Sequence, residues 1–518
     1  MYKPKPRSDG KLDKRKTRLC ARGIDQYESY DLTTFAATPA YSVLRMVIIC
    51  ALAEGVQPQQ ADIVSAFQIP TLREKICITL PSGYSIDGMT TAFALKCMQG
   101  FRQAAREWGT LSNNWVLDYD KRIKPIAKAG GCLYVIWRPD LKFMMIRWVD
   151  DFVGFSSDNN RYINRLFAAM GKKFPIKILG GIQQVLGTTV IWGGTWAILR
   201  QTRNIEHIAE EYKVLEHTRA RTTPITSDEV ALLIRPEATT STAPFRQLLG
   251  EMMWIVMLTR PDMAFCIVRL ASCASAWTDE IYQALLNAAR FLYDTREYGI
   301  ILRAPAEGAH ERGEFNIISY ADASHAICPM TKRSVTGTMV FLNGSLLSYS
   351  STAQKTVAIS STESELVAAT ESARDVEFFR HMIGEFATVQ SPSRIHIDNE
   401  GARFIASTEK CSKQSRHIGI RHFYCRELVL KGAVIFGHVP GTDNISDSLT
   451  KALQRDKYTM YARIVIFKPP DNGTREEEAG TDTDPDDKPQ QCTRQKGRWY
   501  ADSKAAKSTI NVIENQHN

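Results

Sequence analysis

No apolar stretch in the 518-residue sequence is long enough to cross a bilayer, because a spanning helix needs roughly 18 to 20 apolar residues in succession. The run from Met46 to Ala53 is shorter and predicts a buried helix segment. No apolar core follows the basic residues at 3, 5 and 7, so the pattern of a signal peptide is missing. The eleven cysteines include no Cys-x-x-Cys pair, which argues against a zinc knuckle or a disulfide framework and favours a reducing interior.

What is present is the composition of an ordinary globular protein, with 44% hydrophobic and 23% charged residues. A chain of this length predicts about three to four domains. The net charge of +9 is concentrated, because residues 1 to 23 contain nine Lys/Arg against two Asp, which gives 9 − 2 = +7. Such a basic arm indicates a polyanionic partner, although a solvated terminal segment explains the same composition.

Acidic residues with apolar neighbours are the strongest functional signal. Asp62 lies in "QPQQADIVSAF", and Asp150 and Asp151 lie in "MMIRWVDDFVGF". Burying adjacent carboxylates is costly, because like charges repel and lose hydration, unless cations lie between them. Apolar runs at 132–138 and 142–148 predict a hairpin that ends at this pair, with a strand ending near Asp62 beside it. The alternative is a solvated turn, the commoner setting of an isolated Asp-Asp pair.

A second α/β pattern begins near Glu314. Runs at 315–321, 334–342, 345–351 and 356–359 predict strands, Asn343-Gly344 predicts a two-residue hairpin turn, and apolar spacing predicts a helix from about Thr362. Beyond about Lys468 the chain has little to bury, so we expect it to be disordered. Four acidic residues accompany this pattern, each of which would alone be explained as a helix cap or a surface charge: Asp322, Glu365, Asp398 and Asp447.

The order of these motifs resembles the reverse transcriptase and RNase H part of copia-type retrotransposon Pol polyproteins. The resemblance rests on "KTRLCARG" (16–23), "ADIVSAF" (61–67), "KCMQGFRQAAREW" (96–108) and "WVDD" (148–151), and later on "SYADASHA", "SSTESELVAA", "IHIDNEGA" and "GTDNISDSLTK". It implies a mixed α/β (α+β) fold: a right-hand polymerase module of fingers, palm and thumb-like part (1–220), a connection region (221–312), an RNase H-like domain (313–455) and a polar, largely disordered tail (456–518).

The resemblance also implies an RNA-directed DNA polymerase with ribonuclease H activity and two Mg²⁺ ions, or Mn²⁺, in each site. Its partners would be an RNA template, a DNA primer, RNA–DNA hybrids and dNTPs, with other parts of a Pol polyprotein as further candidates. No membrane partner is expected. A cytoplasmic particle and the nucleus are both compatible with this chemistry.

Residue roles carry over only where the motifs match. In the polymerase site, the metal ligands would be Asp62, Asp150 and Asp151, and the dNTP contacts would be Lys16, Arg18, Arg22, Phe67 and Gln99. Phe67 would exclude a 2′-hydroxyl by its bulk, or else be a core residue. In the nuclease site, the ligands would be Asp322, Glu365, Asp398 and Asp447. His438 would assist proton transfer or product release there, or be a surface histidine.

Some further residues match the copia-type motifs but have a second explanation, and others differ from these motifs. Leu186-Gly187 matches a pair near the primer. Trp148 replaces a usual Tyr, Ala105 a usual Pro, and Gln99 a usual Tyr, and strands that precede Tyr2 in the family's fingers are absent. The alternative is therefore a decayed or co-opted copy that binds nucleic acid without polymerising, or that keeps only the nuclease. Four arginines would face the hybrid or be solvated: Arg333, Arg416, Arg421 and Arg426.

Overall fold

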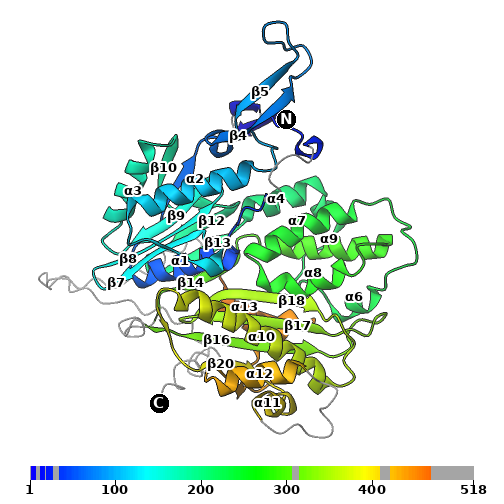
Figure 1. Cartoon of the computed structure of the whole chain (residues 1–518). Helices are drawn as coiled ribbons and strands as arrows, with labels where there is room; N and C mark the ends of the chain where they lie inside the picture. Colours follow the sequence, from blue (N-terminus) through cyan, green and yellow to red (C-terminus); the bar gives the residue numbers. More distant parts are fainter. Residues whose placement is uncertain are drawn as a thin grey trace, which may run out of the picture.

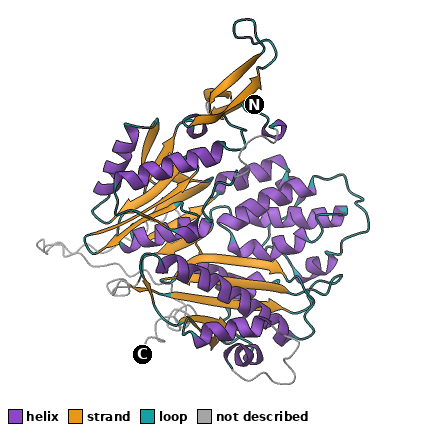
Figure 2. Ribbon diagram, in the orientation of Figure 1, coloured by secondary structure: helices purple, strands orange, loops and turns teal. Residues whose placement is uncertain are grey.

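The structure, a computed structural model, describes residues 2–6, 12–17, 19–26, 34–305, 314–408 and 420–467. Three larger sheets with their helices organise these residues (Figures 1 and 2). No helix in the described part of the chain combines the length and apolar composition that a membrane span requires. The expected mixed α/β fold is confirmed.

The first sheet has six strands in the order β10-β3-β9-β8-β7-β6. Its strands are β3 (Gln59–Ile63), β6 (Lys124–Pro125), β7 (Leu133–Arg138), β8 (Leu141–Trp148), β9 (Asp151–Ser156) and β10 (Ile176–Gly181). Alternate residues of a strand face opposite sides, so Tyr134 and Phe143 pack with α2 (Ala104–Tyr119) and α3 (Arg161–Gly171). Val135 and Met144 pack on the other face with α1 (Tyr41–Ala53), which is buried almost all round, as its continuous apolar sequence predicts.

The second sheet joins distant parts of the chain in the order β11-β12-β13-β14-β22. Its strands are β11 (Gln184–Val185), β12 (Thr188–Trp192), β13 (Trp196–Arg200), β14 (Gly299–Arg303) and β22 (Ile466–Phe467). The pairing of β13 with β14 therefore crosses the predicted boundary at residue 220. Leu186 and Gly187 form the β11–β12 turn, both with positive φ (52° and 75°).

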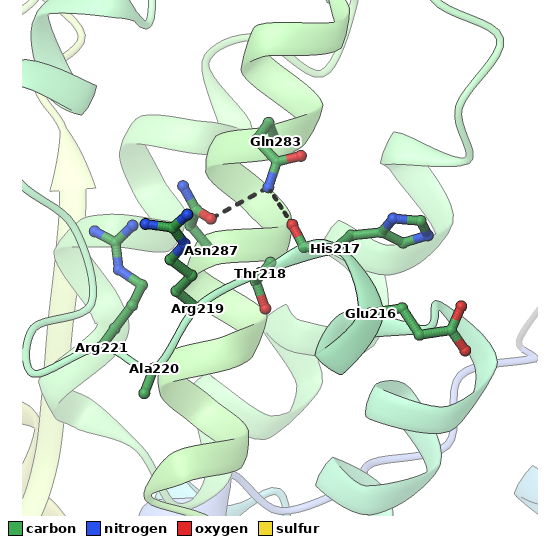
Figure 3. A pocket seen from close by; sticks show the side chains of 8 residues that line it. All are labelled: Glu216, His217, Thr218, Arg219, Ala220, Arg221, Gln283 and Asn287. Carbon is green, nitrogen blue, oxygen red and sulfur yellow. Dashed lines mark hydrogen bonds between the residues drawn. The ribbon is translucent and has the colours of Figure 1, made fainter.

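Helices α4 to α9 form a group beside the second sheet (Figure 1). They are α4 (Thr202–Glu211), α5 (Val214–His217), α6 (Ser227–Leu232), α7 (Phe245–Leu258), α8 (Ala264–Ala271) and α9 (Asp279–Asp294), with a 3-10 turn, η4 (Pro261–Met263), before α8. A cavity of about 510 Å³ opens between α5 and α9 (Figure 3). Its lining includes no residue of either acidic set: Glu216, His217, Thr218, Arg219, Ala220, Arg221, Gln283 and Asn287.

The third sheet has the order β18-β17-β16-β20-β21, antiparallel as far as β16 and parallel beyond it. Its strands are β16 (Ile317–Ser324), β17 (Val335–Leu342), β18 (Ser345–Ala353), β20 (Ser393–Ile397) and β21 (Val434–His438). The parallel strands need crossover helices, which are α10 (Ser361–Gly384), α11 (Glu400–Ser407) and α12 (Ile420–Leu430). Three antiparallel strands followed by helix-connected parallel strands is an RNase H-like arrangement.

Shorter elements complete the fold. Two hairpins, β1 (Tyr2–Pro6) with β2 (Leu12–Thr17) and β4 (Thr71–Thr79) with β5 (Thr91–Lys96), lie outside the larger sheets. A short parallel pair joins β15 (Glu314–Phe315) to β19 (Thr388–Val389). The remaining elements are η1 (Gly23–Asp25), η2 (Ala66–Gln68), η3 (Ala127–Ala129), η6 (Ile445–Leu449) and α13 (Arg455–Val465).

Two sequence expectations are corrected. The predicted strand at 356–359 is irregular, because it lies on the path from β18 to α10 and leaves Val357 and Ile359 50% and 75% exposed instead of facing a core. The predicted tail at 456–518 begins too early, because α13 and β22 continue to residue 467. Tyr458, Tyr461 and Val465 bury an apolar face of α13 that the polar composition around it obscures.

Candidate active sites

The first acidic set meets where β8 turns into β9. Trp148 and Asp151 pair across this hairpin, so Val149 and Asp150 form a two-residue turn. Asp151 is also paired directly with Asp62 of β3. The backbone N–H of Ile63 donates to the Asp150 carbonyl at 2.9 Å, which ties the turn to β3. The predicted hairpin of residues 132–138 and 142–148 is formed by β7 and β8, and the predicted neighbouring strand is β3.

The electrostatics agree with this proximity. Burial raises the pKa of Asp151 to about 6, with further contributions from the charges of Asp150 and Asp62, while a hydrogen bond from Gln60 opposes the rise. Asp150 is exposed, and Asp62 and Asp151 are half-buried. Carboxylates that raise one another's pKa favour a cation between them.

The second acidic set gathers at one edge of the third sheet. Asp322 lies on β16, Glu365 on α10, Asp398 just after β20 and Asp447 on η6. Oxygen atoms of Asp322, Asp398 and Asp447 all lie within 4.8 Å of one another. Within the described ranges this is the one group of three or more acidic, His or Cys residues that is so close, and Asp62, Asp150 and Asp151 do not meet the same limit.

Glu365 completes the second set from the helix side. It is 7% exposed, and one of its carboxylate oxygens has no hydrogen-bond partner among the described residues. Burial raises its pKa to about 9, and the charges of Asp322 and Asp398 add to the rise. An unpartnered buried oxygen beside other carboxylates suits an oxygen-preferring divalent cation.

Comparisons with known proteins find relatives along most of the chain. Residues 1–227 match the family model described as reverse transcriptase (RNA-dependent DNA polymerase). The Retrovirus-related Pol polyprotein from transposon TNT 1-94 of Nicotiana tabacum is 24% identical over 483 residues, 90% of this chain and 35% of that protein. The corresponding protein from transposon RE1 of Arabidopsis thaliana is 26% identical over 467 residues, 89% of this chain and 31% of that protein.

The chain is thus similar to copia-type retrotransposon Pol polyproteins along about 90% of its length, and its residues 1–227 match the reverse transcriptase family model. It spans about a third of the length of these relatives. Among solved structures, the foamy viral protease-reverse transcriptase in complex with RNA/DNA hybrid is 12% identical. That likeness covers 76% of this chain and 45% of that chain, with a TM-score of 0.39. The similarity to Pol polyproteins rests on the sequence matches and not on this structural likeness.

The copia-type motifs expected to meet a dNTP are partly described. Gln99 lies beside residues 20–22, because its carbonyl accepts from the Ala21 N–H at 2.8 Å and its side-chain oxygen accepts from the Cys20 thiol at 3.8 Å. Arg22 lies in this segment and pairs with Asp25 at 3.1 Å. Arg18 lies outside the described residues, and Lys16 is described only as part of strand β2.

Phe67 and the departures from the family pattern have simple structural settings. Phe67 lies on η2, which follows the strand that carries Asp62, and is half-buried against two apolar clusters. Trp148 stacks on Tyr41 with 4.9 Å between ring centroids, and Tyr41 also meets Trp254 of α7 at 5.8 Å. Ala105 lies in the first turn of α2, where proline is tolerated.

Two lysines that sequence reasoning missed lie in the second acidic set. The Lys451 ammonium lies 2.6 Å from Asp447 Oδ1 and 3.4 Å from Asp322 Oδ1. The Lys457 ammonium lies 2.6 Å from Asp447 Oδ2. Both oxygens of Asp447 therefore face a cation supplied by the chain. The signal available in the sequence was the spacing of four residues from Asp447 to Lys451.

A side-chain hydrogen bond and close packing hold Asp447 against the sheet. The side-chain amide of Asn444 donates to the Ala321 carbonyl at 3.0 Å, next to Asp322. Gly337 on β17 allows η6 to approach, because a Cβ there would lie 2.7 Å from the Cβ of Leu449. Close packing of η6 on β16 and β17 thus brings Asp447 to Asp322.

The remaining residues predicted for the nuclease site have fewer contacts with the second acidic set. His438, at the end of β21, has its Nδ1 3.8 Å from a carboxylate oxygen of Glu400. Arg333 is exposed in the loop before β17. Arg426 is half-buried on α12, and its Nε has no hydrogen-bond partner within the described residues. Arg416 lies outside the described residues, and Arg421 is described only as part of α12.

Proposed function

We propose that this chain is an RNA-directed DNA polymerase with ribonuclease H activity that acts on primer–template duplexes and RNA–DNA hybrids. The observation that carries the proposal is the presence of two separate acidic sets on two sheets. One is centred on the Asp62–Asp151 strand pair and the other on the Asp322, Asp398 and Asp447 group. Similarity to copia-type Pol polyproteins supports the same pairing of activities.

In the proposed polymerase site, Asp62, Asp150 and Asp151 hold divalent cations. Their fit to Mg²⁺ or Mn²⁺ rests on an all-oxygen donor set and on the raised pKa of Asp151. When bound, such ions activate the primer 3′-hydroxyl and stabilise the leaving pyrophosphate. Arg22 and Gln99, which share one segment, are proposed to orient the incoming dNTP, together with Lys16 and Arg18.

The polymerase site needs further positioning groups. Phe67 follows Asp62 and is proposed to discriminate against a 2′-hydroxyl by steric exclusion. Leu186-Gly187 is proposed to lie near the primer. The other parts of a Pol polyprotein are further proposed partners, because the relatives carry that name and exceed this chain about threefold in length.

In the proposed nuclease site, Asp322, Glu365, Asp398 and Asp447 hold two cations of the same kind. The unpartnered buried oxygen of Glu365 supports this fit. The chain's own contribution is to exclude water from Asp322 and to orient Asp447 through η6. His438 is proposed to move a proton or assist product release from the exposed edge.

The test is a pair of substitutions measured in two assays. Asp150→Asn should abolish primer extension on an RNA template and leave cleavage of an RNA–DNA hybrid intact. Asp398→Asn should abolish cleavage and leave extension intact. Loss of both activities from one substitution, in a protein that keeps its thermal unfolding temperature, would contradict the division into two sites.

A nuclease without polymerase activity is the second candidate. The specific observation in its favour is that only the nuclease carboxylates reach 4.8 Å of one another among the described residues. Cleavage by the unaltered chain without extension would identify this case. Retention of nucleic acid with neither activity would identify a decayed or co-opted copy.

A further inference from the structure

The turn that carries Asp150 has an unfavourable backbone. Val149 has φ of 59°, a left-handed conformation that β-branched residues rarely adopt. Of the two turn residues, Val149 alone has positive φ, a position for which glycine is usual in hairpins. Since such a conformation persists only where surrounding contacts hold it, those contacts identify what positions Asp150.

One contact comes from helix α2. The indole N–H of Trp108 donates to the Val149 carbonyl at 2.6 Å. Trp108 is 1% exposed, so neither water nor a ligand competes for this bond. The Val149 carbonyl belongs to the peptide that links Val149 to Asp150, and the bond therefore restrains the orientation of that peptide.

A second contact acts on the next peptide. The Asp150 carbonyl accepts from the Ile63 N–H of β3 at 2.9 Å. Two consecutive carbonyls, on either side of the Asp150 Cα, are thus held by donors from different elements. Together they determine where the Asp150 side chain leaves the turn.

Trp108 itself packs against a residue that precedes β10, the strand paired with the Asp62 strand β3. Its ring meets Phe174 edge-on with 5.5 Å between centroids. Phe174 precedes β10, which pairs with β3 and places Lys177 opposite Asp62. Trp108, which holds the turn, therefore packs against the segment that leads into the strand paired with β3.

We propose that Trp108 is a positioning residue of the polymerase site, whose indole N–H holds the strained Val149–Asp150 peptide so that Asp150 faces Asp62 and Asp151. The inference rests on the proposed polymerase function for its kinetic consequence, and on the turn geometry alone for its structural consequence.

Trp108→Phe removes the donor and keeps an aromatic ring. We expect kcat for primer extension to fall by about tenfold to a hundredfold, with KM for dNTP little changed, because the fault is misplacement of a reacting group. Hybrid cleavage should be unaffected. The matched control is Trp115→Phe, because Trp115 packs on the same Phe174 from the same helix, and it should leave extension near the unaltered rate.

Val149→Gly supplies the decisive comparison. Glycine adopts positive φ without a steric penalty, so the turn of the Val149→Gly variant needs less restraint from Trp108. In the Val149→Gly background, Trp108→Phe should therefore lower kcat and the unfolding temperature by less than it does in the unaltered chain. Equal losses in both backgrounds would show that Trp108 acts only through packing and would overturn the proposal. If the unaltered chain does not extend a primer, the polymerase function fails, whereas the unfolding-temperature comparison still decides the role of Trp108.

Discussion

At the residue scale, the two acidic sets differ in how much water they retain. Asp150 is exposed at the tip of its turn, whereas Asp322 is fully buried and Asp447 nearly so. Burial raises the pKa of Asp322 to about 6, partly opposed by the nearby Lys451 ammonium. The carboxylates of the second acidic set therefore depend on internal cations more than those of the first set do.

Replacing Lys451 by Gln tests this dependence. In EDTA, loss of the ammonium leaves Asp447 and Asp322 less neutralised, and we expect the unfolding temperature to fall by about 1–3 °C, for a loss of about 1 kcal/mol. Mg²⁺ should then raise the unfolding temperature of the variant more than that of the unaltered chain. Differential scanning calorimetry with and without Mg²⁺ measures both.

The control for this experiment is Lys431→Gln. Lys431 pairs with Glu427 at 2.6 Å on an exposed helix surface, where both side chains are about 60% accessible. Lys431→Gln should change neither the unfolding temperature in EDTA nor the rise that Mg²⁺ causes. An identical Mg²⁺-induced rise in the Lys451 variant and in the unaltered chain would show that Lys451 does not share the cation position.

Sequence reasoning at the residue scale found acidic side chains and missed their supports. Asp150 and Asp322 stand out because charge inside apolar runs is rare. Trp108 and Lys457 do not stand out, since an aromatic on a helix and a lysine near the end of the domain have many ordinary explanations. Their roles depend on contacts across 41 and 10 residues of sequence, respectively.

At the element scale, periodicity located most helices and strands. The turn at 139–140 and the turn at Asn343-Gly344 lie where expected, the latter with φ of 49° and 82°. The strand at 356–359 failed, because an apolar run indicates a strand only when a neighbouring strand and a core are available to it.

Proline at the start of α2 gives a test at this scale. Ala105 occupies the first turn of the helix, where a backbone N–H has no intrahelical partner. Ala105→Pro should therefore change the free energy of unfolding by less than about 0.5 kcal/mol. Asn114→Pro, at an exposed position in the interior of α2, should cost about 3 kcal/mol or more. Urea denaturation of both variants measures the difference, and a comparable loss from Ala105→Pro would contradict the placement of the helix start.

At the scale of the whole molecule, the parts that carry the two acidic sets share one apolar cluster, which runs from α1 through the second sheet to the third sheet. Buried polar contacts reinforce this junction. The Tyr458 hydroxyl of α13 donates to Asp262 at 2.5 Å, and Asp262 pairs with the fully buried Arg260 at 2.7 Å. Helix α13 is thereby attached to the 3-10 turn η4 between α7 and α8.

Arg45 tests the coupling between these parts. It is 4% exposed on α1, and its guanidinium donates to the carbonyls of Leu347 at 3.1 Å and Leu258 at 2.9 Å. Arg45→Met leaves these buried carbonyls without that donor, so we expect the free energy of unfolding to fall by about 2–4 kcal/mol. Arg374→Met, which removes an exposed pair with Glu371, should change it by less than about 0.5 kcal/mol.

Because the cluster is continuous, the unaltered chain should unfold in one cooperative calorimetric transition, with both activities lost at the same temperature. Two well-separated transitions, one for each activity, would contradict a shared core.

The sequence by itself determined the similarity to copia-type Pol proteins, most of the helices and strands and the candidate acidic residues of both sets, because charge placement and apolar periodicity are local properties of a chain. Only the tertiary structure decided which backbone bonds hold Asp150, which lysines face Asp447 and how α13 joins the second sheet. Those features depend on contacts between residues far apart in sequence, and many combinations of distant residues are compatible with the same local pattern.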